Sequence, residues 1–452
     1  MTDALNDTRE LRDSAREIFR DALAAADARR AVLEAVRVEG ASLRVFGERF
    51  DASSRVYSVA IGKAAAAMAS ALEERLGELI ARGVLSAPPS DLKVSSRWRV
   101  FEGGHPLPNA ASLDAARAAF ELLDEADYSS ALVVFLVSGG GSAMLESTRD
   151  ARVTLEDLRE ANRLLVSCGA AIEEVNAVRR ALSAVKGGGL SRRAPRSPQV
   201  TLIISDVPRG RERDVASGPT LAPPRDSPDA REVVARYGLD SKLPRSINLA
   251  LEESSAPRAS EHEGEASRNH FVLLDNDSAC NAALESARER GFAVELAEEI
   301  SEQSVNEGAA LLVSRLFELY AREGARGRGV CLVSGGEFAC PVRGAGVGGR
   351  SSETALRCAF EIEKALRGET GGTKPRRVVA LCAGTDGVDG NSPAAGALAD
   401  NSTPLRASER GLDATKHLEE SDAYTFFDTL GDAIGAGPTG TNVRDLRILL
   451  AD

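Results

Sequence analysis

Aromatic residues are scarce in this chain, and the usual metal-binding patterns are missing. Aromatic side chains make up 4% of the 452 residues, with a single Trp, so the core must be built mainly from Ala, Leu and Val. The six cysteines form no CxxC pair, and none of the four histidines stands at zinc-ligand spacing. We therefore expect reduced thiols in the core, as is usual for proteins of the cytoplasm.

Long apolar and long basic runs are also missing. No stretch reaches the roughly 20 uncharged residues of a membrane span. Residues 1–27 mix Asp, Glu and Arg without the apolar centre of a secretory signal, and they predict an amphipathic helix instead. Acidic residues outnumber basic ones, 68 to 56, which argues against a nucleic-acid backbone as partner. We expect a cytoplasmic protein that binds neither membranes nor nucleic acids.

What the chain does contain is an alternation of β-branched strands and helices. Strands are predicted at 56–61, 132–137 and 200–204, which is the βαβ rhythm of a parallel sheet with helices on both faces. The length favours two domains. The charged stretch 252–269 is the predicted linker, because it could bury little apolar surface. After it, a strand from Phe271 is expected to open a second α/β domain.

Glycine-rich loops with hydroxyl groups follow several of these strands. They are SGGGSAML from Ser138, SGGE from Ser334, GAGVGGRSSE from Gly344 and AGTDGVDG from Ala383. Backbone N–H groups in such loops converge on anions, so several of them together suggest a polyphosphate ligand. The chain has no GxxxxGK[ST], and the GxGxxG match at Gly344 lacks the later strand and acidic residue of a dinucleotide fold.

Individual side chains near these loops suit phosphate chemistry. Lys63 stands at a strand-to-helix junction, where its ammonium group would face the crevice at the strand ends, or it is a surface lysine beside a helix start. His105 lies in a rigid Gly/Pro loop, where it could donate to an anion or orient a substrate hydroxyl. It could also be a structural histidine bonded to the backbone. Asp206 ends a strand, where it could hold Mg²⁺, and Arg350 could bind two anionic oxygens at once. A nucleophile elbow is disfavoured because GxSxG fails around Ser142.

In this order, the motifs resemble those of the glycerate 2-kinase family with a C-terminal MOFRL domain, whose members have also been labelled hydroxypyruvate reductases. The matching strings span nearly the whole chain and are GKAAAAM, GGHPLPN, SGGGSAML, the block from Asn176 to Leu190, SDV…ASGPT, SGGE…GxGGRxxE, AGTDGxDG and GPTGTNV. The resemblance implies an α/β fold of two domains. The first, residues 1–255, would have a Rossmann-like, doubly wound, mostly parallel sheet, and the second, residues 256–452, would be the MOFRL domain.

The resemblance further implies an active site in the inter-domain cleft and transfer of a phosphoryl group from ATP, with Mg²⁺, to the 2-hydroxyl of D-glycerate. ATP and D-glycerate would be the partners, and a homodimer is left open. The family's functional residues carry over as follows: catalytic Lys63, Arg350 and Asp206; nucleotide- or phosphate-binding Ser138, Gly139, Gly140, Gly141, Ser142, Lys186, Gly187, Gly188, Ser334, Gly335, Gly336 and Glu337; substrate-binding His105, Asn176, Arg179 and Asp386; metal-binding Asp206 and Asp386.

Two departures from the family pattern bear on substrate and activity. Arg209-Gly210 stands where a Gly-Asp pair is usual, so a carboxylate near the metal is missing unless Glu212 or Asp214 replaces it. Ala181 replaces a family His. Two other functions remain open, a reductase that uses NAD(P)H and a sensor that binds nucleotide or sugar acid without turnover.

Overall fold

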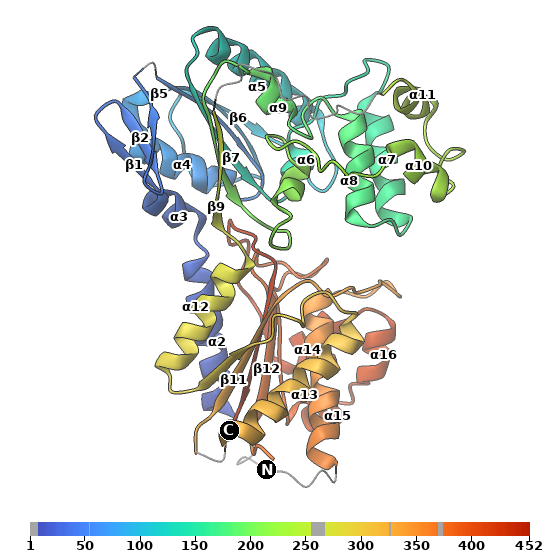
Figure 1. Ribbon diagram of the computed structural model, residues 1–452. Coiled ribbons are helices and arrows are strands. Elements are labelled where there is room, and N and C mark those ends of the chain that lie inside the picture. Colours follow the sequence, from blue (N-terminus) through green and yellow to red (C-terminus); the bar gives the residue numbers. More distant parts are fainter. Residues whose placement is uncertain (1–7, 54, 255–266, 325–326, 369–373) are drawn as a thin grey trace. The chain divides into compact units, whose positions relative to one another are not determined.

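The computed structural model describes residues 8–53, 55–254, 267–324, 327–368 and 374–452. Their contacts divide the chain into two compact units (Figure 1). We call Ala28–Leu273 the N-terminal unit, and the residues up to Asp27 together with Leu274–Asp452 the C-terminal unit. The boundary predicted between residues 255 and 256 lies outside the described residues.

A six-stranded sheet forms the centre of the N-terminal unit, in the order β6-β5-β4-β7-β8-β9. Its strands are β4 (Val56–Ile61), β5 (Ile80–Ala87), β6 (Trp98–Glu102), β7 (Leu132–Ser138), β8 (Gln199–Ile204) and β9 (Arg268–Leu274). The pairs β5/β6, β4/β5, β4/β7 and β7/β8 are all parallel, as predicted. From β4 the chain first adds strands on one side and then, from β7, on the other. This reversal between β4 and β7 is where ligands bind in doubly wound folds.

The strand predicted to open the second domain belongs to this first sheet. The expected segment from Phe271 lies in β9, which is the last strand of the six. The prediction was wrong because a strand's own sequence does not say which sheet edge it joins. The ring of Phe271 also packs against Phe46, which lies in the turn of an antiparallel hairpin between Val45 and Glu48, and the two ring centres are 6.0 Å apart.

Helices cover both faces of this sheet, and an antiparallel hairpin sheet accompanies it. The helices are α3 (Ala28–Ala35), α4 (Ala65–Leu76), α5 (Ala110–Tyr128), α6 (Gly141–Met144), α7 (Leu155–Ser167), α8 (Ile172–Leu182), α9 (Gly189–Arg193), α10 (Ala230–Arg236) and α11 (Arg245–Glu253), with 3₁₀ turns at Gly77–Leu79 and Glu212–Ser217. The small sheet consists of β1 (Val36–Glu39), β2 (Ser42–Val45) and β3 (Glu48–Asp51). Helices α7, α8, α10 and α11 share a core of their own beside the main sheet (Figure 1).

The C-terminal unit contains a mixed sheet in the order β10-β11-β15-β12-β13-β14. Its strands are β10 (Ala293–Leu296), β11 (Val330–Gly336), β12 (Val378–Gly384), β13 (Gly396–Asp400), β14 (Ala433–Ile434) and β15 (Asp445–Ala451), and its helices are α2 (Arg9–Ala25), α12 (Asn276–Glu289), α13 (Val305–Glu323), α14 (Arg350–Arg367), α15 (Thr403–Glu409), α16 (Ala414–Glu419) and α17 (Ala423–Leu430). Strand β15 runs antiparallel to β11 and β12, so Asp445 stands opposite both Gly336 and Gly384. The start of β15 therefore joins the edge at which β11 and β12 end.

Residues 9–25 form the predicted amphipathic helix, but it packs in the C-terminal unit. Helix α2 lies beside α12 (Figure 1) and buries Ile18 and Phe19 in the core under β12 and β15. Arg12 pairs with Asp400 and Asp432, which are both buried. We predicted this helix in the first domain because it comes first in the chain. Its apolar face and the ion pairs of Arg12 with Asp400 and Asp432 instead determine where it packs. Among the described residues, no helix combines the length and apolar character required to cross a membrane.

Asp389 fixes the start of α14 and with it the position of Arg350. Its Oδ1 and Oδ2 accept hydrogen bonds from the backbone N–H groups of Ser351 and Ser352, at 2.9 and 2.8 Å. Two of the N–H groups that a helix leaves without partners are thus satisfied by an internal carboxylate. Burial raises the pKa of Asp389 to about 6, although these hydrogen bonds act in the opposite direction.

Asp389→Asn should change the pH dependence of stability. Because the pKa of Asp389 is about 6 when folded and near 3.8 when exposed, the folded protein binds more protons between these values. The contribution of Asp389 to stability therefore falls as the pH rises through this window. We expect the free energy of unfolding of the wild type, measured in urea relative to the variant, to fall by up to about 3 kcal/mol from pH 3.5 to pH 7. A difference between the two proteins that does not change with pH would contradict this.

Candidate active site

The ends of β4 and β7 meet at the reversal point of the N-terminal sheet and are tied together. The N–H of Lys63 donates to the carbonyl of Gly139 at 2.9 Å, and the N–H of Ala64 donates to Ser138 Oγ at 3.1 Å. Ser138 Oγ in turn donates to the carbonyl of Ile61 at 3.2 Å. The Ser138 hydroxyl, predicted to bind phosphate, is thus buried and used to join the two loops.

Three predicted site residues lie against the glycine loop that follows β7. A Cβ on Gly139 would be 2.1 Å from Asp206 Oδ2, so any other residue here would displace this carboxylate. A Cβ on Gly140 would be 3.1 Å from the ring of His105 and 3.3 Å from Lys63 Cγ. The structure therefore brings Lys63, His105 and Asp206 together around the loop.

Asp206 fits the way in which proteins hold Mg²⁺ beside phosphates. Within the described ranges, no group of three or more His, Cys, Asp or Glu side chains could hold a metal ion. Mg²⁺ in kinases usually takes one or two carboxylates, and phosphate and water oxygens complete its coordination. A single carboxylate at the glycine loop is compatible with that. The second predicted ligand, Asp386, belongs to the C-terminal unit, where its Oδ1 accepts the N–H of Val388 at 3.1 Å.

The other end of the loop is connected to Asn176 through Ser217. Ser142 Oγ lies 3.0 Å from Ser217 Oγ, which donates to Asn176 Oδ1 at 2.9 Å. Ala216 and Ser217 have φ values of 51° and 61°, a left-handed backbone that non-glycine residues adopt only at a cost. The strained turn therefore places the Ser217 hydroxyl between Ser142 and Asn176.

Neither of the two acids that could have replaced the missing family carboxylate stands free. Asp214 pairs with Arg180 at 2.6 Å and with Arg211 at 2.9 Å. Glu212 Oε1 accepts the N–H of Gly210 at 2.8 Å. The sequence could not anticipate the pair with Arg180, because Arg180 lies on α8, 34 positions before Asp214.

Lys186, Gly187 and Gly188 are occupied by internal contacts. Lys186 is 1% exposed and forms an ion pair with Glu146, which also accepts from Ser183. Burial lowers the pKa of Lys186, and Glu146 opposes that effect. The N–H groups of Gly187 and Gly188 donate to the carbonyls of residues 217 and 218 at 3.1 and 2.7 Å. Gly187 and Gly188, predicted to bind nucleotide, thus contact the strained turn, and Lys186, with the same predicted role, contacts Glu146.

Arg179, predicted to bind substrate, makes one of the contacts that join α7 and α8. Its Nε donates to Asn162 Oδ1 at 2.8 Å. Burial lowers the pKa of Arg179, whereas the carboxylate of Glu146 acts to raise it. The carboxylate of Glu146 thus acts to raise the pKa of both Arg179 and Lys186.

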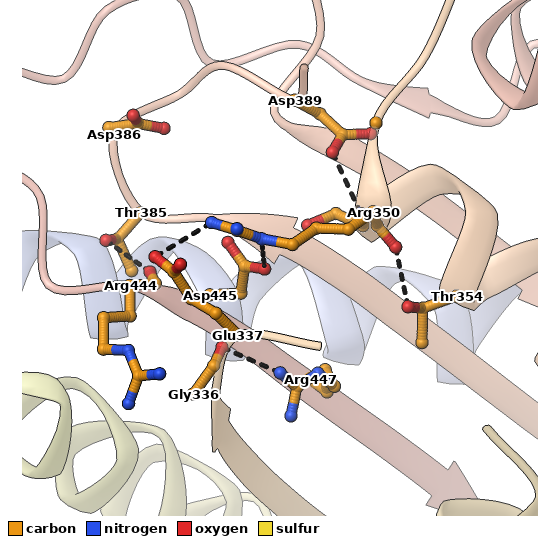
Figure 2. A network of polar contacts seen from close by, with 12 residues as sticks. Gly336, Glu337, Arg350, Thr354, Thr385, Asp386, Asp389, Arg444, Asp445 and Arg447 are labelled. Carbon is orange, nitrogen blue, oxygen red and sulfur yellow. Dashed lines mark hydrogen bonds and ion pairs between the residues drawn. The ribbon is translucent and has the colours of Figure 1, made fainter. Parts of the chain in front are cut away.

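In the C-terminal unit, Arg350 points into an acidic pair at the shared edge of β11, β15 and β12 (Figure 2). Its Nε donates to Asp445 Oδ2 at 2.6 Å, and its Nη2 lies 2.9 Å from Glu337 Oε1. Burial acts to lower the pKa of Arg350, but Asp445 and Glu337 outweigh it and raise the pKa above its usual value. Asp386 lies to one side of this network (Figure 2).

Arg447 underlies the SGGE loop and was missed in the sequence. It is 2% exposed, and its guanidinium donates to Ser334 Oγ at 2.8 Å and to the carbonyls of Gly335 and Gly336 at 2.7 Å each. It also stacks 3.6 Å from the centre of the Phe338 ring. The loop thus surrounds an internal cation with its carbonyl groups. An arginine within the apolar strand DLRILLA was the signal that could have revealed it.

The amino-acid sequence of the chain matches known protein families and relatives. Residues 14–252 match a family model described as a domain of unknown function, DUF4147, and residues 330–445 match the MOFRL family. A glycerate 2-kinase of Pyrococcus horikoshii is 32% identical over 98% of this chain and 97% of its own length. A human glycerate kinase is 34% identical over 97% of this chain and 93% of its own.

A solved structure agrees with these sequence matches. The crystal structure of a glycerate kinase from Thermotoga maritima superposes with a TM-score of 0.79 at 31% identity, and the match covers 98% of this chain and 100% of that one. Both the sequence and the two-domain α/β fold are therefore shared over nearly the full length. The chain belongs to the glycerate 2-kinase family that joins a DUF4147 domain to a MOFRL domain.

Proposed function

We propose that this protein transfers the γ-phosphoryl group of ATP to the 2-hydroxyl of D-glycerate, giving 2-phospho-D-glycerate and ADP. The observation that carries the proposal is the gathering of Lys63, His105 and Asp206 around the glycine loop at the reversal point of the sheet. A cation, a carboxylate and closely approaching backbone amides are what a polyphosphate and its metal ion require. Kinship with glycerate kinases supplies the acceptor.

The residues of the N-terminal unit would neutralise and position the polyphosphate. Phosphoryl transfer proceeds through a loose transition state, so positioning and charge stabilisation account for most of the catalysis. Lys63 would bind phosphate oxygens, and the N–H groups of Gly139–Gly141 would surround them. Asp206 would hold Mg²⁺, which neutralises phosphate charge when bound. His105 would bind substrate oxygens beside Gly140.

Arg350 would act on the acceptor or on the migrating phosphoryl group. Its planar guanidinium can bind two oxygens of a carboxylate or phosphoryl group at once. The contacts with Asp445 and Glu337 hold it in one orientation before the ligand arrives. Such preorganisation lowers the cost of ordering the side chain during the reaction.

An assay with ATP, Mg²⁺ and D-glycerate tests this function directly. We expect ADP release that depends on all three, with phosphate found on the 2-hydroxyl of the product by ³¹P NMR. A reductase would instead oxidise NAD(P)H when hydroxypyruvate is added. A sensor would bind ATP or D-glycerate without releasing ADP, and either result would overturn the proposal.

Lys63→Ala should abolish most turnover and leave the fold intact. Removing one preorganised charge from a phosphoryl-transfer site should lower kcat/KM by about 100-fold or more. Lys93→Ala, which removes an exposed lysine of the same unit, is the matched control and should behave as the wild type. If Lys63→Ala kept kcat/KM near the wild-type value, Lys63 would have no catalytic role.

Arg350→Lys separates charge from geometry in the C-terminal unit. Lysine keeps the charge but cannot contact Asp445, Glu337 and a bidentate ligand together, so we expect kcat/KM to fall by about 100-fold. Arg367→Lys on the same helix provides the control, because the Arg367 side chain is exposed and pairs with Glu363 on the same helix. Equal activity in the two variants would show that any cation suffices at position 350.

A further inference from the structure

Four side chains of the N-terminal unit form a continuous hydrogen-bonded chain that ends at the glycine loop. It runs from Asp214 through Asn176 and Ser217 to Ser142, with Asn176 Nδ2 donating to Asp214 Oδ1 at 3.3 Å. Asn176 and Ser217 are each 2% exposed, and Ser142 is only partly buried. The chain therefore has a buried, charged end and an accessible end, which is Ser142.

The number of protons along this chain fixes its direction. Asp214, which Arg180 and Arg211 contact, can only accept, so Asn176 must donate its amide group there. The Asn176 carbonyl then accepts the single hydroxyl proton of Ser217. Ser217 has no second proton, so its contact with Ser142 requires Ser142 to be the donor. Ser142 thus donates its single hydroxyl proton to Ser217, and only its lone pairs remain available to a ligand.

From this polarity we infer that Ser142 accepts a hydrogen bond from the hydroxyl group of the substrate that is not phosphorylated, and so helps to select a dihydroxy acid over its deoxy analogue. The inference rests on the proposed function. It also revises the predicted role of Ser142 as a phosphate ligand, because ionised phosphate oxygens have no proton to offer to an acceptor. Metal-bound water and the ribose hydroxyls of bound ATP are other donors that would suit such an acceptor.

The chain is unsuited to removing a proton from the reacting hydroxyl. Burial acts to raise the pKa of Asp214, but hydrogen bonds from Arg211 and Arg180 outweigh it and hold the pKa below its usual value. A carboxylate that is stabilised in its ionised form is a weak base. The chain therefore fixes Ser142 as an acceptor without providing a route for proton transfer, which favours the spectator hydroxyl over the reacting one as its partner.

The strained turn gives independent support. Ala216 and Ser217 hold φ values of 51° and 61° in a buried segment. In this backbone the Ser217 hydroxyl lies between Ser142 and Asn176. Strain of this kind persists where the surrounding contacts enforce it, and it clusters at functional sites.

The test compares D-glycerate with D-lactate, which lacks the 3-hydroxyl. The ratio of their kcat/KM values is measured for the wild type, Ser142→Ala and Ser217→Ala, and D-lactate is used as a competitive inhibitor where its turnover is undetectable. We expect the wild type to favour D-glycerate by about 10-fold or more, and Ser142→Ala to lose most of this preference with KM for ATP retained. Ser217→Ala should also lose the preference for D-glycerate, because the Ser142 hydroxyl can then donate its proton to a ligand instead of to Ser217.

Ser58→Ala is the matched control for the loss of a buried serine. Ser58 is buried within β4, and its Oγ donates to the carbonyl of Val134 at 2.8 Å. This variant should be less stable but should keep the preference for D-glycerate. Thermal unfolding of all variants separates loss of stability from loss of selectivity.

The outcomes separate this inference from the proposed function. If the wild type phosphorylates D-glycerate but neither Ser142→Ala nor Ser217→Ala changes the preference, the inference is wrong and the function stands. A changed dependence on Mg²⁺ concentration with unchanged preference would assign the donor to metal-bound water and would likewise overturn the inference. If D-glycerate is not phosphorylated at all, both fail.

Discussion

The close approach of β4 and β7 is the constraint on which the rest of the site depends. A Cβ on Gly62 would lie 2.3 Å from Ser138 Oγ, and Gly62 has a φ of 112°, so the position accepts only glycine. The two loops then share hydrogen bonds through Ser138 and the carbonyl of Gly139. Because Lys63 follows Gly62 directly, this contact aims its side chain along the glycine loop. The location of Lys63 is thus a consequence of backbone packing.

Internal charges and dipoles explain why the glycine loops are not equivalent. Asp389 occupies the N–H groups at the start of α14, Arg447 takes the carbonyls of the SGGE loop, and the turn at Ser217 takes the N–H groups of Gly187 and Gly188. These loops resemble anion sites in their glycines, but the groups named here are engaged in internal contacts. The loop after Ser138 differs, because the side chains that lie against it are those of Lys63, His105 and Asp206.

The sequence predicted what is local and missed what is assembled from distant segments. Strands β4, β7 and β8 are continuous apolar runs, so their periodicity and the loops that follow them could be predicted. The capping box of Thr154 and Asp157 also depends only on residues close in the sequence, where a Thr is followed three residues later by an Asp. By contrast, the assignments of α2 and β9 depend on which exposed edge or face their residues fit, and a single sequence does not contain that information.

The same distinction applies to the site. The position of Lys63 beside the Ser138 loop follows from parallel topology, whereas the pairing of Lys186 with Glu146 does not, because residues 146 and 186 come from different segments. The strand DLRILLA shows that Arg447 is an unusual buried charge, but it does not show which groups compensate that charge. The partners lie at Ser334, Gly335 and Gly336, more than 100 residues earlier in the chain.

The departure from the family pattern after Asp206 now has a physical meaning. Arg211 in this loop contacts both Glu173 and Asp214, so the segment stabilises a carboxylate instead of supplying one to a metal. That carboxylate sets the direction of the hydrogen bonds through Asn176 and Ser217. The loop would then affect how Ser142 binds the substrate that receives the phosphoryl group, and it would not affect how the phosphates are bound. On the proposed function, phosphate binding at one end of the glycine loop and hydroxyl recognition at the other would vary separately, because different side chains support each end.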